Sequence, residues 1–340
     1  MSEHINFTMP HLGGDKRAPS YFAAACLYSL TALGLTFMPF LTGAVQTLCA
    51  VLLPGLDTSF FSALTQVCFY SLCIIIPLYI YLKNHSGMSD AMRFNGITTR
   101  RAILCVMAGV MGLFFTNFVS YIWFMLVEGM GGRLVSGTNV PTTPSQLCQA
   151  IVFSAILPGV CEELVFRGAI LSAWERGGSK RAVLVSACLF ATLHASIGGL
   201  PSELINGIIL AIIAVSTDSL FACMIYHTVF NSTALILAYV AQAQAAAETA
   251  EVSASLFASI GGMAGLIPLL FDILITGAAL FITLRALDRI RLFEGRRVFG
   301  NEEGVRHNWR WSELGVLFSG VGVMAMWYVY DLMKVMGVIR

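Results

Sequence analysis

Pro158-Gly-Val-Cys-Glu-Glu-Leu-Val-Phe-Arg167 places three charges within six residues of an otherwise apolar segment. This segment, residues 149–174, has the length and composition of a membrane-spanning helix. A charge at the centre of such a helix costs about 2.5–3.5 kcal/mol when it faces lipid, so Glu162, Glu163 and Arg167 are expected to face the interior of a bundle. The stretch therefore predicts a polytopic membrane protein with a polar site inside it.

The composition of the whole chain fits this prediction. Hydrophobic residues make up 57% of the 340 residues and charged residues only 11%, well below the share in soluble domains. The net charge of +1 gives no reason to expect a nucleic-acid partner. The nine cysteines, an odd number without C-x-x-C spacing, argue against a disulfide framework and a thiolate metal site. The sequence therefore predicts an all-α bundle of about eight or nine transmembrane helices in a lipid bilayer.

Apolar segments recur along the chain at lengths near the roughly 20 residues that cross a hydrocarbon core. The predicted spans are residues 21–52, 59–82, 102–127, 149–174, 182–200, 202–217, 219–245, 256–284 and 313–335. The first is long for one straight helix, and Pro39 is a candidate break point within it. The segment 202–217 is the shortest, so its crossing is the weakest prediction of the set.

The Lys and Arg residues orient these spans. With the N-terminus inside, only Arg133, Lys334 and Arg340 fall on the outer side, and Arg167 lies within the membrane. This asymmetry follows the positive-inside rule and predicts a multi-pass cell-membrane protein with a cytoplasmic N-terminus. The first 20 residues are polar, so no signal peptide is expected. We divide the chain into a cytoplasmic segment 1–20, N-terminal helices 21–144, a transmembrane core 145–245 that contains the charged cluster, and C-terminal helices with a basic cytoplasmic loop 246–340.

The spacing of the three charges separates two roles. Glu163 and Arg167 are four residues apart, so they can face each other as an ion pair on a helix. Glu162 is rotated by about 100° from Glu163, so the two carboxylates cannot share one position. One carboxylate can neutralise the arginine while the other remains for chemistry. A purely architectural ion-pair network is the alternative interpretation of the cluster.

Two further polar pairs occur at helical spacing. Phe190 precedes His194 by one turn, and His227 precedes Asn231 by one turn, each pair in an apolar segment. A one-face pair such as His227 and Asn231 suits donors to a developing oxyanion, although it also suits a structural hydrogen bond. At 1.5 Å per residue, Glu162, His194 and Asn231 all lie about 18–21 Å from the inner helix ends. This common depth predicts one buried site that activates water.

These residues resemble a known family. Glu162-Glu163-x-x-x-Arg167, Phe190-x-x-x-His194 and His227-x-x-x-Asn231, in this order over about residues 145–240, resemble the CPBP family of CAAX proteases and bacteriocin-processing membrane proteins, once called the Abi family. The stretch Thr217-Asp218-Ser219-Leu220 and Gly207 resemble bacterial members. The remaining segments lie outside the resemblance.

The resemblance implies a glutamic intramembrane endopeptidase, similar to type II CAAX prenyl endopeptidases, in the bacterial inner membrane. Glu162 with His194 would activate the attacking water, and Glu163 could exchange roles with Glu162. Arg167 with Glu163 would hold the site, and His227 with Asn231 would stabilise the oxyanion. The implied substrate is a membrane-associated or lipophilic peptide or protein, and the implied chemistry needs no metal and no cofactor.

Other functions remain open on the sequence alone. A zinc peptidase could use His194, His227 and a glutamate as ligands, although no H-E-x-x-H helix is present. A proton-coupled transporter could use Glu162, Glu163, His194 and Asp272 as a relay, and Asp272 is an intramembrane carboxylate that the protease interpretation leaves unused. An immunity or scaffold protein is the third alternative. The substrate's identity and the oligomeric state do not follow from the sequence.

Overall fold

The computed structural model describes residues 20–52, 65, 67–68, 70–84, 92–133, 140–245, 262–293 and 310–339. The helices are α1 (Tyr21–Leu52), η1 (Tyr70–Ile75), α3 (Ile76–Asn84), α5 (Thr99–Gly129), α6 (Pro144–Ala150), η2 (Ile151–Ile156), α7 (Leu157–Glu163), η3 (Leu164–Ile170), α8 (Leu171–Trp174), η4 (Glu175–Gly177), α9 (Ser179–Leu193), α10 (Leu200–Thr217), α11 (Leu220–Ala245), α13 (Met263–Phe293) and α14 (Trp311–Val335). These residues contain no strand, which confirms the all-α prediction. The nine cysteines are all free thiols, as their spacing predicts.

The long helices agree with most of the predicted spans. In the described part of the chain, seven helices are long and apolar enough to cross a membrane, and a shorter apolar helix runs over Tyr70–Lys83. The helix from Pro144 to Trp174 is continuous and contains the predicted span 149–174. Most of residues 53–69, the residues 246–261 and the basic loop 294–309 lie outside the described residues, so the predictions made there are not tested.

Three span predictions need correction. The helix α1 continues through Pro39 without a break. The predicted span 182–200 ends as a helix at Leu193, after only 15 residues, because the chain turns at His194–Gly199 before α10 begins. The predicted span 256–284 is shifted, since α13 runs from Met263 to Phe293. By contrast α10, the weakest span prediction, forms an 18-residue helix.

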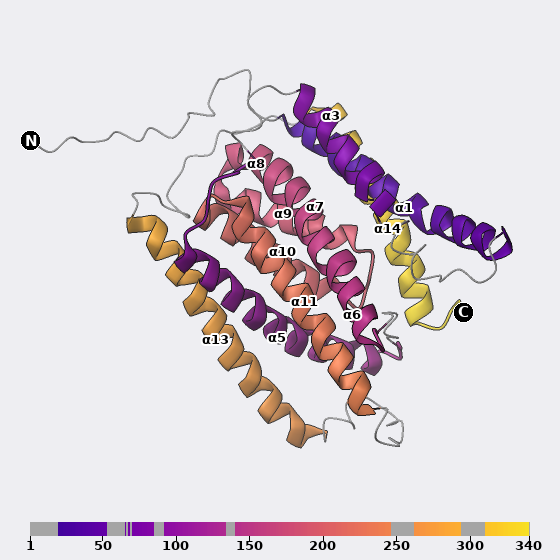
Figure 1. The fold of residues 1–340 in the computed structure, drawn as a ribbon, viewed down its shortest axis with the longest axis vertical. Helices are drawn as coiled ribbons and strands as arrows, with labels where there is room; N and C mark the ends of the chain where they lie inside the picture. The colour runs from indigo at the N-terminus through magenta and orange to yellow at the C-terminus, as the bar shows by residue number, and fades with distance from the viewer. Residues whose placement is uncertain are drawn as a thin grey trace, which may run out of the picture.

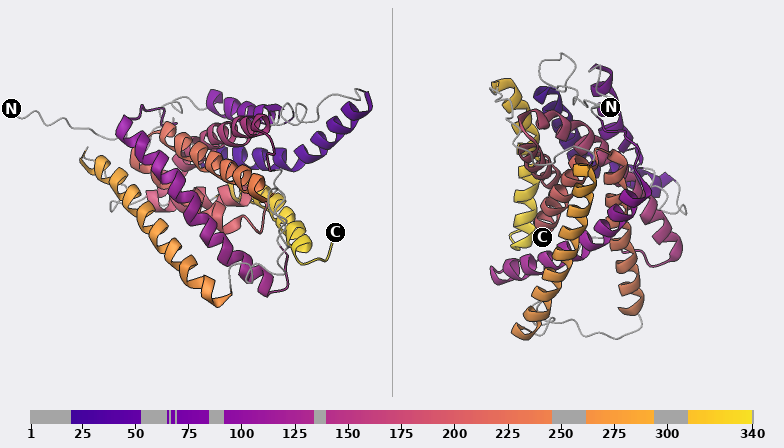
Figure 2. Two further views of the ribbon diagram at one scale, coloured as in Figure 1. Left: turned by 60° about the horizontal axis from the view of Figure 1, so that its bottom comes forward. Right: turned by 90° about the vertical axis from the view of Figure 1, so that its left-hand side faces the viewer.

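The helices form a layered bundle. Figure 1 and Figure 2 place α13 at one side and the group α1, α3 and α14 at the opposite side, with α5 to α11 between them. The helix α5 packs along α13, α11 and α10, whereas α1 packs along α14. The core site is therefore enclosed by α6–α8, α9, α10 and α11, which occupy the middle of the bundle.

The turn between α9 and α10 is partly exposed, and side chains of other helices bind its backbone. The indole Nε1–H of Trp123 donates to the carbonyl of Ile197 at 2.8 Å, and the N–H of Ile197 donates to Asp331 Oδ2 at 2.7 Å. The Tyr328 hydroxyl donates to the carbonyl of Ala191 at 2.8 Å. Because these bonds satisfy backbone groups that lipid could not, the hairpin can end within the membrane.

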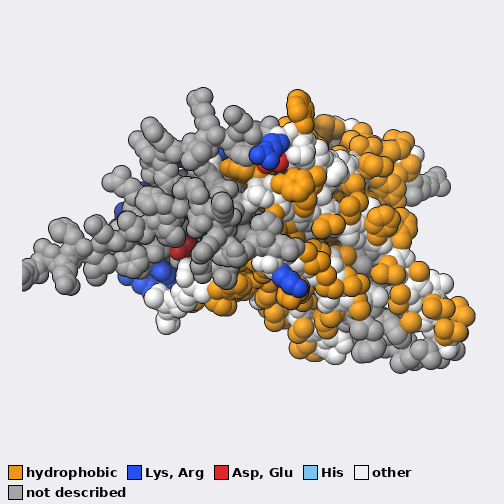
Figure 3. Space-filling view, turned by 90° about the horizontal axis from the view of Figure 1, so that it is seen from above, with side chains coloured by type: hydrophobic (Ala, Val, Ile, Leu, Met, Phe, Trp, Pro, Cys, Tyr) orange, Lys and Arg blue, Asp and Glu red, His pale blue; other side chains and the backbone are white. Residues whose placement is uncertain are grey.

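Segments that the positive-inside rule assigns to one side of the membrane meet in the structure. Arg93 forms ion pairs with Glu175 and Asp218, which joins three inner segments. At the other end, the N–H of Arg133 donates to the carbonyl of Val335 at 2.7 Å, which joins two outer segments. Viewed from above Figure 1, hydrophobic side chains cover the right-hand part of the surface, while Lys and Arg are few and scattered (Figure 3). Such an apolar surface suits contact with lipid.

Candidate active site

The helix that carries Glu162 and Glu163 is locally unusual. It contains two π-helical turns, Ile151–Ile156 and Leu164–Ile170, on either side of α7. Turns of this kind are rare and often mark functional sites. Pro158 has no N–H to donate to the carbonyl of Ser154, four residues earlier. The side-chain Nδ2 of Asn231, on α11, donates to that carbonyl at 3.3 Å.

Glu163 is the centre of a buried charged cluster. Its Oε1 accepts from Nη1 of Arg167 at 2.9 Å and lies 2.7 Å from Nδ1 of His227. The side chains of Glu163 and Arg167 are completely buried, and that of His227 is 3% exposed. The i to i+4 ion pair predicted from the spacing is thus present, and it also binds a histidine from α11. Since an ionised carboxylate only accepts, His227 donates its Nδ1–H and keeps Nε2 for another partner.

Three neighbours surround the guanidinium group of Arg167, and among the described residues its buried Nε has no hydrogen-bond partner. Besides Glu163, its Nη2 donates to the carbonyl of Gly207 at 3.2 Å. Its guanidinium carbon lies 4.4 Å from the centroid of the Phe190 ring, within the range of a cation–π contact. Gly207 lets α10 approach α9 closely, because a Cβ there would lie 2.9 Å from Cα of Ala187. The arginine therefore joins α10 and α9 to the glutamate helix.

Glu162 points to a different neighbour. Its Oε1 accepts a hydrogen bond of 3.2 Å from the hydroxyl of Tyr70, a buried residue of η1. Unlike Glu163, Glu162 keeps partial exposure. The two adjacent carboxylates thus have separate surroundings, as their 100° separation on the helix predicts.

His194 lies at the C-terminal end of α9. Its Nδ1 lies 2.9 Å from the carbonyl of Phe190, and its Nε2 lies 3.5 Å from Oε2 of Glu203 in the first turn of α10. The side chains of His194 and Glu203 are 30% and 26% exposed. His194 is therefore more open than His227, which is enclosed by the bundle.

The ring of Phe190 brings the three motifs together. Its centroid lies 4.7 Å from that of His194 and 6.0 Å from that of His227. Phe166, from the glutamate helix, packs edge-on against Phe190 at 5.2 Å. Phe190 is therefore the buried contact between both histidines and the arginine.

The structure brings some of the predicted site residues into direct contact and others only near them. Glu163, Arg167 and His227 are bonded together, and His194 joins them through Phe190. The side-chain amide of Asn231 donates a hydrogen bond to the carbonyl of Ser154. Tyr70 and Glu203 were not predicted to belong to the site. Tyr70 carries no sequence signal, whereas Glu203 could have been noticed as a carboxylate within a predicted span.

Asp272 lies apart from this site. It is exposed on α13, which packs against α5 and α10, and its carbonyl accepts from the Thr276 hydroxyl at 2.6 Å. Arg167 has other partners, so the structure gives no support to a pairing with Asp272. The relay that the transporter alternative requires is not assembled among the described residues.

No group of three or more His, Cys, Asp or Glu side chains in the described part of the chain is arranged to hold a metal ion. The ligand set that the zinc alternative requires is thus not gathered there, since Nδ1 of His227 faces Glu163 and Nε2 of His194 faces Glu203.

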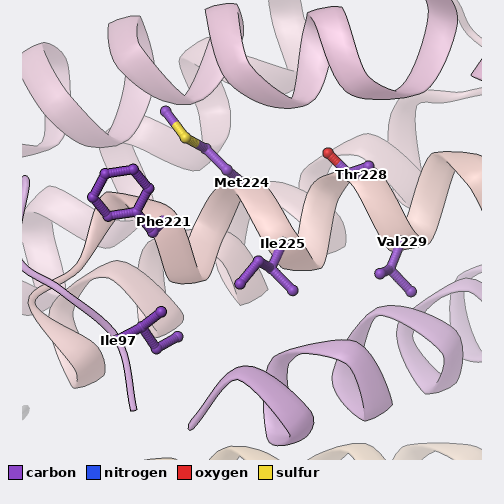
Figure 4. Close-up of a pocket in the computed structure, with 6 residues that line it drawn as sticks. All are labelled: Ile97, Phe221, Met224, Ile225, Thr228 and Val229. Carbon is purple, nitrogen blue, oxygen red and sulfur yellow. The ribbon is translucent and has the colours of Figure 1, made fainter. Parts of the chain in front are cut away.

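An apolar groove runs along α11 beside the site. It is lined by Phe221, Met224, Ile225, Thr228, Val229 and Ile97. In Figure 4, Met224 and Thr228 point to one side of α11, while Ile225 and Val229 point to the other. Thr228 directly follows His227 and closely contacts α7, where a Cβ at Gly159 would lie 2.6 Å from its Oγ1. The groove is therefore hydrophobic, and Thr228, one of its lining residues, contacts the helix that carries Glu162 and Glu163.

Comparison with known families finds a match over the segment that holds these residues. Residues 144–233 match the family model described as type II CAAX prenyl endopeptidase Rce1-like. Searches of curated proteins and of solved structures each found no significant match. The matched segment contains all three motifs, from Glu162 to Asn231, so the resemblance inferred from them is confirmed. Over residues 144–233 the chain is thus similar to the Rce1-like type II CAAX prenyl endopeptidases.

Proposed function

We propose that the chain is an intramembrane endopeptidase that hydrolyses a peptide bond in a membrane-associated or lipophilic peptide or protein. The observation that carries the proposal is the meeting of Glu163, Arg167, His194 and His227 around Phe190, inside the segment that matches the Rce1-like family. A site that combines a buried carboxylate and histidine with a second, partly exposed carboxylate and histidine suits general acid–base chemistry.

In this proposal Glu162 with His194 activates the attacking water, and Glu162 accepts its proton. Glu162 is the available carboxylate because Glu163 is already bonded to Arg167 and His227. The hydrogen bond from Tyr70 would fix the orientation of the Glu162 carboxylate and leave its other oxygen for water.

His227 and Asn231 are proposed to stabilise the oxyanion. Because Nδ1 of His227 faces Glu163, its Nε2 is the nitrogen that can reach the substrate. Glu163 and Arg167 would hold this ring in place from behind. The side-chain amide of Asn231 donates to the carbonyl of Ser154 in the structure, and we propose that it also donates to the oxyanion.

The surroundings of the site support a lipophilic substrate in the cell membrane, proposed here to be a bacterial inner membrane. The groove along α11 is almost entirely apolar and is lined in part by Thr228, the residue after His227, so an apolar chain could lie there while the peptide bond reaches the site. The basic residues of the inner segments support a cytoplasmic N-terminus.

A comparison of protein termini tests the proposal. Cells that express the wild-type chain, Glu162→Gln or Asp272→Asn at equal levels would be compared by mass spectrometry of peptide and protein termini. We expect a precursor that stays uncut with Glu162→Gln but is cut by the wild-type chain and by Asp272→Asn. Termini that are the same in all three strains, with each chain inserted, would reject the protease function.

Further measurements distinguish the proposed peptidase from a zinc peptidase, a transporter and a scaffold protein. Purified chain would be assayed on the precursor with and without 1,10-phenanthroline, and inhibition that Zn²⁺ reverses would favour the zinc peptidase. Asp272→Asn would abolish function if the relay of the transporter alternative operated, while leaving termini unaffected in every strain. A scaffold would tolerate Glu162→Gln but not deletion of the chain.

A further inference from the structure

Both ring nitrogens of His194 face an acceptor. Nδ1 lies 2.9 Å from the carbonyl oxygen of Phe190, and Nε2 lies 3.5 Å from a carboxylate oxygen of Glu203. A neutral imidazole carries one N–H and can donate to one of these acceptors, whereas an imidazolium carries two and can donate to both. The geometry therefore favours the doubly protonated ring.

The α9–α10 hairpin adds to this preference. His194 caps the C-terminal end of α9, where the partial negative charge of the helix favours a cation. Glu203 lies in the first turn of α10, where the partial positive charge favours a carboxylate. The turn that separates them is fixed by Trp123 and Asp331, so the two side chains are held face to face.

The other charged or titratable groups around His194 come from four elements. Glu162 of α7 attracts an imidazolium, as Glu203 does, while Arg167 of η3 opposes it. His227 of α11 lies beyond the Phe190 ring, and Asp331 of α14 binds the backbone of the turn. Two carboxylates thus act on His194 against one arginine, whose charge is shared with Glu163.

We propose that Glu203 is a positioning residue that keeps His194 protonated on both nitrogens, so that His194 is the acid that protonates the leaving amine. This inference rests on the proposed peptidase function and narrows the part of His194 in it: Glu162 alone takes the proton of the water, and His194 makes the second proton transfer. The geometry assigns the carboxylate to the water and the imidazolium to the amine.

The proposed steps balance. The water oxygen forms a bond to the scissile carbonyl carbon while one water proton moves to Glu162. The tetrahedral intermediate then breaks its carbon–nitrogen bond, and the Nε2 proton of His194 moves to the departing nitrogen. The proton held by Glu162 passes to His194, which restores the imidazolium beside Glu203. Peptide and water thereby give an acid and an amine without any other reactant.

Nuclear magnetic resonance tests the protonation directly. The full-length chain would be labelled with nitrogen-15 at histidine in dodecyl maltoside micelles, and His194→Gln would identify the His194 signals. At neutral pH we expect imidazolium shifts for His194 in the wild-type chain, in Glu203→Asp and in Asp272→Asn, the matched carboxylate control. In Glu203→Gln we expect a neutral ring.

Cleavage supplies the second readout. We expect Glu203→Gln to cut the precursor found by the terminus comparison at least about tenfold more slowly than the wild-type chain, with Glu203→Asp retaining more activity. An imidazolium that persists in Glu203→Gln, a neutral His194 in the wild-type chain, or an unchanged cutting rate would each overturn the inference. If Glu203→Gln fails to insert, the wild-type spectrum alone still decides whether the ring is doubly protonated. The spectrum needs no substrate, so a chain that cuts nothing would reject the proposed function separately.

Discussion

The side chains of Glu162 and Glu163 leave one helix about 100° apart, and this angle sends them to different partners. Glu163 enters the buried cluster with Arg167 and His227, whereas Glu162 meets the hydroxyl of Tyr70. The helical spacing predicted the ion pair, because its two members lie on one helix. It could not predict the bonds to His227 and Tyr70, because these depend on how separate helices pack.

Substitution of the two glutamates should therefore affect stability differently. Glu163→Gln leaves buried Arg167 and His227 without a carboxylate, so we expect the free energy of unfolding to fall by about 3–5 kcal/mol. Glu162→Gln keeps a hydrogen-bond acceptor for Tyr70 and should change it by less than about 0.5 kcal/mol. Thermal unfolding of both variants in detergent gives the comparison. Equal losses would show that the cluster does not hold the fold.

Removal of the Tyr70 hydroxyl should reduce activity but not folding. Tyr70→Phe deletes the donor to Glu162, and a hydrogen bond to a charged group contributes about 1.5–3 kcal/mol. We expect kcat/KM on the identified precursor to fall about tenfold or more. The control is Tyr79→Phe, since Tyr79 belongs to the neighbouring α3 and is 63% exposed. A Tyr70→Phe chain as active as this control would place Tyr70 outside the site.

At the scale of elements, the lengths of the apolar segments predicted where helices occur better than they predicted where those helices begin and end. The helix over Pro144–Trp174 was expected because its apolar run exceeds a membrane's thickness. The early end of α9 was not expected from the sequence. It depends on Trp123, Asp331 and Tyr328, which lie on distant helices and bind the backbone at the end of α9 and in the turn that follows. The π-helical turns beside α7 likewise have no apolar pattern of their own.

Substitutions at Asn231 and Pro158 can separate the structural role of Asn231 from its proposed role in catalysis. Asn231→Ala should lower the free energy of unfolding by about 1 kcal/mol, because the Ser154 carbonyl loses its donor. It should also lower kcat by about 10²–10³, as loss of an oxyanion donor does. Adding Pro158→Ala restores a backbone N–H that can donate to this carbonyl.

The double variant decides between the roles. We expect Pro158→Ala with Asn231→Ala to recover thermal stability in detergent but not the rate of precursor cleavage. Recovery of both would mean that Asn231 acts only by satisfying the carbonyl of Ser154 and has no direct part in the reaction.

The contact between α9 and α10 should tolerate no added methyl group at Gly207. A Cβ there would lie 2.9 Å from Cα of Ala187, so Gly207→Ala must move α10 and the carbonyl that binds Arg167. We expect lower thermal stability and loss of cleavage. Gly322→Ala in α14 is the control, since its Cβ would meet nothing within 4 Å and alanine favours a helix by about 0.5–1 kcal/mol. Similar behaviour of the two variants would contradict the close packing at Gly207.

At the scale of the molecule, the charge asymmetry and the packing agree on which segments share a side. The inner segments meet through Arg93, Glu175 and Asp218, and two outer segments meet through Arg133 and Val335. The short α9 does not change this order, because α9 and α10 leave and return to the same side as a hairpin. Sequence counting could assign sides, but only the structure shows that the segments touch.

Reporter insertions test the resulting topology. Alkaline phosphatase, which is active only outside the cytoplasm, would be placed at residue 137, at residue 302 or after residue 340 in a bacterial host. We expect activity at the first and third positions and none at the second, because Arg133 and Val335 are bonded at one end of the bundle while residue 302 follows the basic inner end of α13. Opposite results at residues 137 and 340 would contradict this contact, since two segments bonded to each other cannot lie on opposite sides of a membrane.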